Sequence, residues 1–198
     1  MNTNCKTCNT DHSDSRDRDA CKERWMLMQR FEIKALKVAE FASEETTCYQ
    51  AKIYVDGKAA VLASNDGHGG CDRYEPIKFD DASKARFADA MVLLEQACEG
   101  RTWDGFDGDP IDYNVEMLVG DMITEAQATK DVKAQLRRRA VFTKPDAEGV
   151  WQVNIPKVQD KDAWVQSFAA RHPEYKVLNL MPLRKAVEIY LEVQSGQV

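Results

Sequence analysis

The sequence has no run of about 18 apolar residues, the length that a membrane-spanning helix needs. Residues 1–24 are polar throughout and lack the apolar core of a secretion signal. Basic residues are also outnumbered, because 27 Lys and Arg face 33 Asp and Glu for a formal net charge of −6. This acidic balance argues against a general electrostatic grip on nucleic acid. These absences predict a cytoplasmic protein whose partner is neither a membrane nor nucleic acid.

Recognisable catalytic signatures are missing as well. The sequence has no Ser-His-Asp set, no paired carboxylates and no phosphate-binding loop of the Walker A or GxGxxG type. Only three histidines occur in the whole chain, so few imidazoles are available for acid–base chemistry. The sequence therefore favours a non-enzymatic protein, while leaving a small enzyme open.

The strongest positive signal is an Asp-Gly pair between two apolar-rich segments. Asp56 and Gly57 are typical of a two-residue hairpin turn, because both central positions of that turn need a positive φ. Alternate residues on either side of the turn can share one face: Tyr49, Ala51, Ile53 and Val55 before it, and Ala59, Val61 and Ala63 after it. Residues 31–38 also alternate, with a change of phase that indicates a bulge. A helix fits residues 31–38 too, but a strand completes a three-stranded meander.

Helical spacing dominates the middle of the chain. Phe87, Met91, Leu94 and Cys98 predict a helix over residues 82–99, ended by Gly100. We expect a loop over 101–110 and then a second helix, capped by Asp112 and reaching about residue 138. A second hairpin is expected over residues 140–155, followed by a third helix capped by Asp160 or Asp162. Residues 183–193 fit a strand and a helix equally well.

These elements predict an α+β fold. We expect one antiparallel sheet, made of the meander 31–64 plus the hairpin 140–155, with helices packed on one side. Residues 1–22 form a polar, cysteine-containing leader, and residues 23–198 form a single domain. A core is feasible because hydrophobic residues make up 43% of the chain.

The most unusual stretch is the glycine-rich loop 65–71, which follows the central hairpin. Its glycines allow rare backbone angles and the close approach of a ligand, and successive N–H groups there can bind an anion. His68 could act as an acid or base oriented by Asp66, and Cys71 could be a nucleophile. The alternative is a tight structural turn, and in either case we expect a positive φ in at least one glycine. The candidate binding residues of this loop are Asn65, Asp66, Gly67, His68, Gly69 and Gly70.

Two further stretches hold candidate sites. Six cysteines in a sequence without a secretion signal predict free thiols or a metal site. A zinc site needs four ligands, and this stretch offers Cys5, Cys8, His12 and Cys21. The alternative is a leader with incidental thiols. The acidic loop 103–109 alternates Asp and Gly but does not meet the EF-hand register. We expect Trp103 and Phe106 to be tucked into the core there, and if they are exposed they become candidate anchors for a protein partner.

A basic run follows the second predicted helix, with Lys133, Arg137, Arg138 and Arg139. These side chains could bind phosphates or an acidic partner surface. A solvated helix end is the alternative, because cations near a helix C-terminus complement its dipole.

Several motifs give the chain a resemblance to known sequences. They are YVDGK (54–58), NDGHGG (65–70), VEMLVGDMITE (115–125), RRRAVF (137–142) and WQVNIP (151–156). In these motifs the chain resembles a group of small uncharacterised proteins carried by phages and other mobile elements, over about residues 31–180. The group has no assigned activity and supplies no catalytic residues, so the resemblance implies only an accessory role.

Together these observations predict a non-enzymatic accessory protein of a phage or mobile element. It would act in the host cytoplasm by binding a host protein, for example as an anti-defence inhibitor. The alternative is a small enzyme or a nucleotide- or phosphate-binding protein that uses the glycine-rich loop 65–71.

Overall fold

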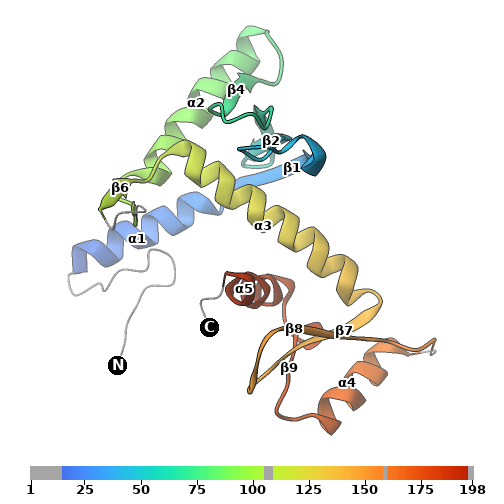
Figure 1. Ribbon diagram of the computed structural model, residues 1–198. Helices are drawn as coiled ribbons and strands as arrows, with labels where there is room; N and C mark the ends of the chain where they lie inside the picture. Colours follow the sequence, from blue (N-terminus) through green and yellow to red (C-terminus); the bar gives the residue numbers. More distant parts are fainter. Residues whose placement is uncertain (1–14, 105–108, 158–159, 196–198) are drawn as a thin grey trace. The chain divides into compact units, whose positions relative to one another are not determined.

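The computed structural model describes residues 15–104, 109–157 and 160–195 (Figure 1). The chain divides into two compact units, with the boundary between Ile123 and Thr124. The boundary falls inside helix α3 (Val115–Leu136), so each unit packs against its own stretch of that helix. The single domain expected over residues 23–198 stays a prediction.

Unit 1 is built on a four-stranded antiparallel sheet. Its strands are β1 (Phe31–Val38), β2 (Tyr49–Val55), β3 (Lys58–Asn65) and β4 (Arg73–Pro76), in the order β1-β2-β3-β4. The predicted hairpin is confirmed, because Asp56 and Gly57 have φ of 50° and 76° as its turn requires. The predicted bulge in β1 is confirmed as well, and Ala35 has a φ of 52° there.

Helices cover one face of this sheet. Helix α1 (Ser15–Met28) contacts α2 (Asp81–Cys98), and α2 contacts β3 and β4. The predicted cap of α2 is confirmed, since the carboxylate of Asp80 accepts the backbone N–H of Ser83 at 2.8 Å. The core brings fully buried sheet residues together with fully buried residues of α2 and α3: Ile53, Val61, Leu94, Leu118 and Val119. The one-sided packing expected from the sequence holds in this unit.

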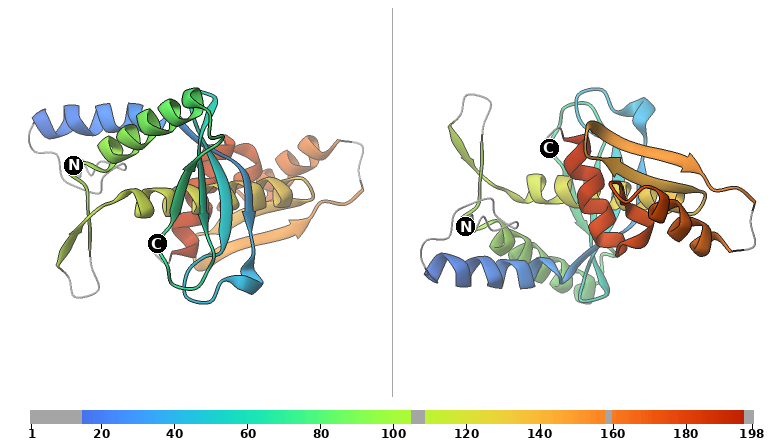
Figure 2. Two further views of the ribbon diagram at one scale, coloured as in Figure 1. Left: turned by 90° about the horizontal axis from the view of Figure 1, so that it is seen from above. Right: turned by 90° about the horizontal axis from the view of Figure 1, so that it is seen from below.

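A two-stranded ribbon takes the place of the loop expected over residues 101–110. Strands β5 (Thr102–Asp104) and β6 (Pro110–Asp112) pair antiparallel, and Figure 2 shows the ribbon apart from the four-stranded sheet. Asp112 belongs to β6, so it is not the cap of α3. Asn114 caps that helix instead, accepting the N–H of Met117 at 3.0 Å, because an Asn side chain caps as well as Asp.

Unit 2 contains a separate three-stranded sheet. Strands β7 (Arg139–Lys144), β8 (Ala147–Asn154) and β9 (Lys176–Val177) lie in the order β8-β7-β9, and all pairs are antiparallel. Val141 packs on one face in a cluster with Val132 of α3 and Val187 of α5 (Leu183–Gln194). The next residue, Phe142, packs on the other face with Phe168 of α4 (Lys161–Arg171). Helices therefore cover both faces of this sheet (Figure 1).

The α+β class predicted from the sequence is confirmed, but the strands of the described residues form two main sheets and a ribbon. The ambiguous segment 183–193 is helical because Ala186 and Val187 both join the core of unit 2. Residues 15–22 of the expected leader belong to α1, where Cys21 is buried. No helix in the described ranges combines the length and apolarity needed to cross a membrane.

Candidate functional site

Asn65, the last residue of β3, organises the glycine-rich loop. Its Nδ2 donates to the carbonyl of Gly70 at 2.8 Å and to the carboxylate of Asp72 at 3.0 Å. Its Oδ1 accepts from the hydroxyl of Thr46 and from the N–H of Gly67, both at 2.8 Å. Two donors and two lone pairs exhaust the hydrogen-bonding capacity of an amide side chain. Asn65 is buried, so its role here is to fix the loop.

Gly67 joins the loop to the connection between β1 and β2. Its carbonyl accepts the backbone N–H groups of Glu44, Glu45 and Thr46 at 3.0, 3.1 and 3.4 Å. Its φ is 87°, and a Cβ at this position would lie 2.1 Å from the carbonyl oxygen of Ala42. The predicted positive φ is thus confirmed, and the backbone contact leaves no room for a side chain.

The remaining loop side chains face outward. Gly69 also has a positive φ, of 81°. His68 is exposed, with its Nδ1 3.1 Å from a carboxylate oxygen of Glu44. Asp66 forms an ion pair with Arg73 at 2.7 Å, so Glu44 and not Asp66 contacts the imidazole. Within the described ranges no hydrogen bond joins His68 to the exposed thiol of Cys71, so the expected pairing of base and nucleophile is not formed.

A cluster that the sequence did not reveal lies behind the loop. The carboxylate of Asp72 accepts the hydroxyl of Tyr49 at 2.5 Å and that of Tyr74 at 2.9 Å. Burial and the neighbouring carboxylate of Asp72 raise the pKa of both tyrosines well above the usual range. Both hydroxyls therefore stay protonated and hold the end of the loop against the sheet. No sequence spacing signals this cluster, because strand pairing brings its members together.

The second unpredicted feature is the segment 39–48, which we call the Phe41 turn. The 3₁₀ turn η1 (Glu40–Ala42) lies in it, and Phe41 is 94% exposed. The backbone around Phe41 is nevertheless held at both ends. The N–H of Ala39 donates to the carbonyl of Cys48 at 2.9 Å, and the N–H of Cys48 donates to the hydroxyl of Ser43 at 2.9 Å.

Acidic residues lie close to Phe41 in the sequence. Three exposed glutamates lie in the same turn: Glu40, Glu44 and Glu45. The Oε2 of Glu45 is only 2.2 Å from where a Cβ of Gly69 would lie, so this carboxylate reaches the glycine loop. The Phe41 turn and the glycine loop are therefore neighbours, joined by Glu45 and by the contact between Glu44 and His68.

The ribbon exposes its apolar residues. Trp103 and Ile111 are directly paired across β5 and β6 and are 43% and 45% exposed. The expected burial of Trp103 is therefore wrong, because the two-stranded ribbon exposes this pair of side chains. Phe106 lies outside the described residues, so its role as an anchor stays a prediction.

The proposed zinc ligands fall mostly outside the structure. Cys5, Cys8 and His12 lie outside the described residues, and Cys21 is buried in α1. In residues 15–104, 109–157 and 160–195, no three His, Cys, Asp or Glu side chains gather as metal ligands would. Zinc binding therefore stays a prediction.

The basic run lies where α3 passes into β7. Lys133 is in the last turn of α3, and Arg137 and Arg138 are exposed beyond it. Arg139 donates to the side-chain oxygen of Gln152 at 2.6 Å across the β7–β8 pair. These positions fit the expected solvated helix end.

Comparison with known proteins finds no matching family model, no matching curated protein and no matching solved structure.

Proposed function

We propose that this chain is a binding protein that recognises a partner protein through the Phe41 turn, with Phe41 as the anchor. The observation that carries this proposal is the 94% exposure of Phe41 on a hydrogen-bonded backbone. Burying such a ring in a partner is worth about 1.5–3 kcal/mol. Aromatic anchors of this kind dominate the free energy of protein interfaces.

The turn is already ordered before binding. The carbonyl of Gly67 holds residues 44–46, and the hydroxyl of Ser43 donates to the carbonyl of Ala39 at 3.0 Å and accepts from the backbone of Cys48. Little conformational entropy is therefore lost when a partner binds, which favours affinity. The rigid glycine loop supports the recognition surface in this proposal.

The charges of the surface indicate the kind of partner. Glu40, Glu44 and Glu45 are exposed in the same turn as Phe41, and we propose a partner pocket that is apolar at its centre and basic at its rim. The resemblance to proteins of phages and mobile elements makes a host protein the natural candidate. We therefore propose an accessory role in which the chain binds, and as an anti-defence factor would inhibit, such a host protein.

The alternative of phosphate or nucleotide binding by the glycine loop has less support. The N–H groups of Gly67 and Gly69 already donate to Asn65 Oδ1 and Thr46 Oγ1. The carboxylates of Glu44 and Glu45 lie against the same loop and would repel an anion.

The test compares two exposed phenylalanines. Wild-type protein, Phe41→Ala and Phe79→Ala are used to capture proteins from a lysate of the host cell, followed by mass spectrometry. Phe79 is a matched control because it is 74% exposed in a different connection, between β4 and α2. We expect a protein that is retained by wild type and Phe79→Ala and lost with Phe41→Ala.

Titration of that purified partner then gives the affinities. We expect Phe41→Ala to weaken binding by about tenfold or more, and His68→Ala to weaken it less. Replacing Glu40, Glu44 and Glu45 by Gln should slow association and reduce its dependence on salt. Equal retention by wild type and Phe41→Ala would refute the proposal.

A further inference from the structure

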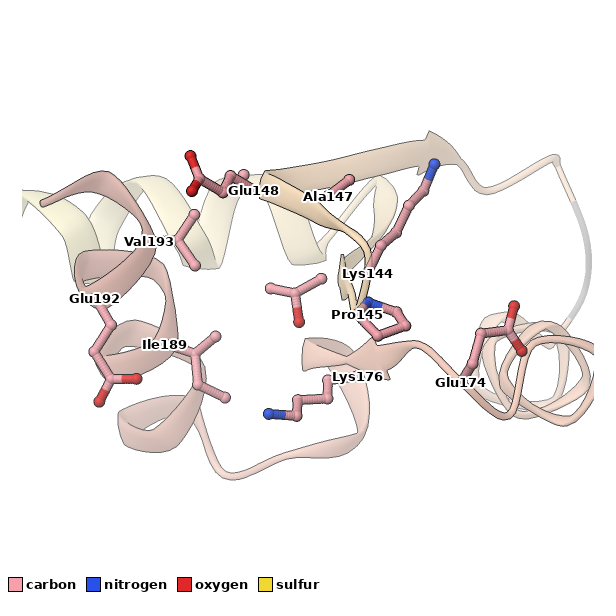
Figure 3. Close-up of a pocket in the computed structure, with 11 residues that line it drawn as sticks. Lys144, Pro145, Ala147, Glu148, Glu174, Lys176, Ile189, Glu192 and Val193 are labelled. Carbon is pink, nitrogen blue, oxygen red and sulfur yellow. The ribbon is translucent and has the colours of Figure 1, made fainter. Parts of the chain in front are cut away.

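A cavity of about 280 Å³ lies in unit 2 (Figure 3). It is enclosed by the tip of the β7–β8 hairpin, by β9 and by the last turns of α5. The charged side chains in its lining are Lys144, Glu148, Glu174, Lys176 and Glu192. This volume lies just below the usual range for ligand pockets and suits a small metabolite better than a nucleotide.

The walls of the cavity are largely apolar. Ile189 and Val193 come from successive turns of α5, and Pro145 and Ala147 come from the hairpin tip across from them (Figure 3). An aliphatic or aromatic group between these four side chains would lose its contact with water, which favours binding. The walls alone do not discriminate between a free molecule and the side chain of a peptide.

The charges at the mouth provide that discrimination. Lys144 points away from the cavity, with its Nζ 3.9 Å from the centroid of the Trp151 ring (Figure 3). Glu174 lies 3.7 Å from a ring nitrogen of His172. Lys144 is therefore engaged by the Trp151 ring, and Glu174 lies beside the imidazole of His172.

Lys176 and Glu192 are left on the same side of the mouth (Figure 3). In the part of the chain that the structure describes, neither side chain has a hydrogen bond or an ion pair. Glu148, on the other side, is likewise unpaired there and adds a second negative charge. A ligand with a cationic and an anionic group close together could form ion pairs with the charged side chains at the mouth. An apolar group next to them could pack against the apolar walls.

We propose that this cavity binds a free α-amino acid with an apolar side chain. Its ammonium group would pair with Glu192, its carboxylate with Lys176, and its side chain would lie against Ile189 and Val193. In an α-amino acid the ammonium and carboxylate groups are both attached to the α-carbon. A simple amine or a simple carboxylic acid would leave one of the charged side chains at the mouth unpaired. A phosphate ester would meet repulsion from Glu148 and Glu192.

The first test is isothermal titration calorimetry of the full chain with L-leucine, L-methionine and L-phenylalanine. Three analogues of leucine serve as controls: 3-methylbutylamine lacks the carboxylate, 4-methylpentanoate lacks the ammonium group, and N-acetyl-L-leucine amide lacks both charges. We expect at least one amino acid to bind, and every analogue to bind about tenfold more weakly or worse than leucine. Equal binding of the neutral amide would show that the cavity takes a peptide side chain, which overturns the proposal.

The second test uses charge-deleting variants. Glu192→Gln should weaken leucine binding about tenfold. It should not weaken binding of 4-methylpentanoate, because this anion has no ammonium group and loses a repelling charge. Lys176→Gln should weaken leucine binding but not binding of 3-methylbutylamine, because this cation has no carboxylate and loses a repelling charge. Glu188→Gln is the matched control, because Glu188 lies one turn earlier in α5 and pairs with Lys185 at 3.0 Å. No binding of any of the three amino acids at about 10 mM, or equal effects of Glu188→Gln and Glu192→Gln, would overturn the proposal.

Discussion

At the scale of single residues, Gly67 shows how the candidate site is fixed. Its carbonyl collects three backbone N–H groups of the Phe41 turn, and its missing Cβ leaves space for the carbonyl of Ala42. A positive φ and a contact of 2.1 Å with backbone both oppose any side chain at this position. The Phe41 turn therefore depends on a residue outside it.

This dependence predicts a large difference between two glycines of the same loop. Gly67→Ala should lower the free energy of unfolding by about 1–3 kcal/mol or more, because backbone strain adds to a steric clash. Gly70→Ala should change it by less than about 0.5 kcal/mol, because a Cβ there meets nothing within 4 Å. Urea denaturation of both variants measures this difference, and equal stabilities would contradict the structural role of Gly67.

The tyrosines behind the loop predict a dependence on pH. Tyr49 and Tyr74 have raised pKa values in the folded protein, first because they are buried and then because Asp72 is close. Their contribution is complete below about pH 10, the pKa of an unfolded tyrosine, and is lost as the pH rises above it. Stability should therefore fall between about pH 10 and pH 11.

Tyr74→Phe tests this assignment. The variant should be about 1.5 kcal/mol less stable than wild type near neutral pH, because a hydrogen bond to a carboxylate is lost. It should then lose less stability than wild type on going to high pH. Tyr54→Phe is the control, because the Tyr54 ring lies on the opposite face of the sheet, 4.6 Å from the Nζ of Lys34. If Tyr54→Phe and Tyr74→Phe have the same profile in urea denaturation, the Asp72 cluster is not responsible.

At the scale of elements, the sequence predicts what has a strong local cause. The hairpin at Asp56 and Gly57 follows from turn chemistry, and α2 follows from an apolar stripe and a cap. Strand β4 was not predicted, because four residues give only two positions on each face and pairing with β3 determines its form. Strands β5 and β6 have three residues each, too few for alternation to be visible.

The sequence predicts the glycine-rich loop of the candidate site but not the exposed side chains beside it. Asn65 and Gly67 were expected from the glycine-rich pattern, whereas Phe41 carries no sequence signal that separates an exposed aromatic ring from a buried one. Asp72 was missed because the packing of β2 and β3 around it, and not sequence spacing, brings Tyr49 and Asn65 to its carboxylate. Local patterns thus locate the rigid part of the site, and long-range packing decides which side chains it presents.

The start of α3 gives a prediction at this scale. Asn114→Ala should lower the free energy of unfolding by about 1 kcal/mol, since the N–H of Met117 loses its cap. Asp112→Ala, at the exposed position first expected to cap the helix, should have an effect below about 0.5 kcal/mol. Thermal melts of the two variants decide between them, and a larger effect at Asp112 would contradict the observed helix start.

At the scale of the whole molecule, the main feature is the presence of separate cores. The apolar face of α3 contributes to two different cores along its length. Leu118 and Ile123 pack in unit 1, whereas Ala128 and Val132 pack in unit 2. The periodicity of this helix reveals which face is apolar but not which core that face joins. For the same reason the sequence predicted one sheet, although β1–β4 and β7–β9 are not hydrogen-bonded to one another.

Separate cores predict separate responses to cavity-forming substitutions. Ile53 in unit 1 and Leu178 in unit 2 are both 0% exposed, so they are matched sites. Ile53→Ala and Leu178→Ala should each lower the stability of the unit concerned by about 2–5 kcal/mol, through lost burial and the cavity left behind. Native-state hydrogen exchange resolves the two effects, because it reports opening free energies amide by amide. Ile53→Ala should accelerate exchange in β2 and β3 more than in β7, and Leu178→Ala should do the reverse. Equal acceleration of β2 and β7 by either variant would mean that the continuous helix α3 couples the two cores into a single cooperative unit.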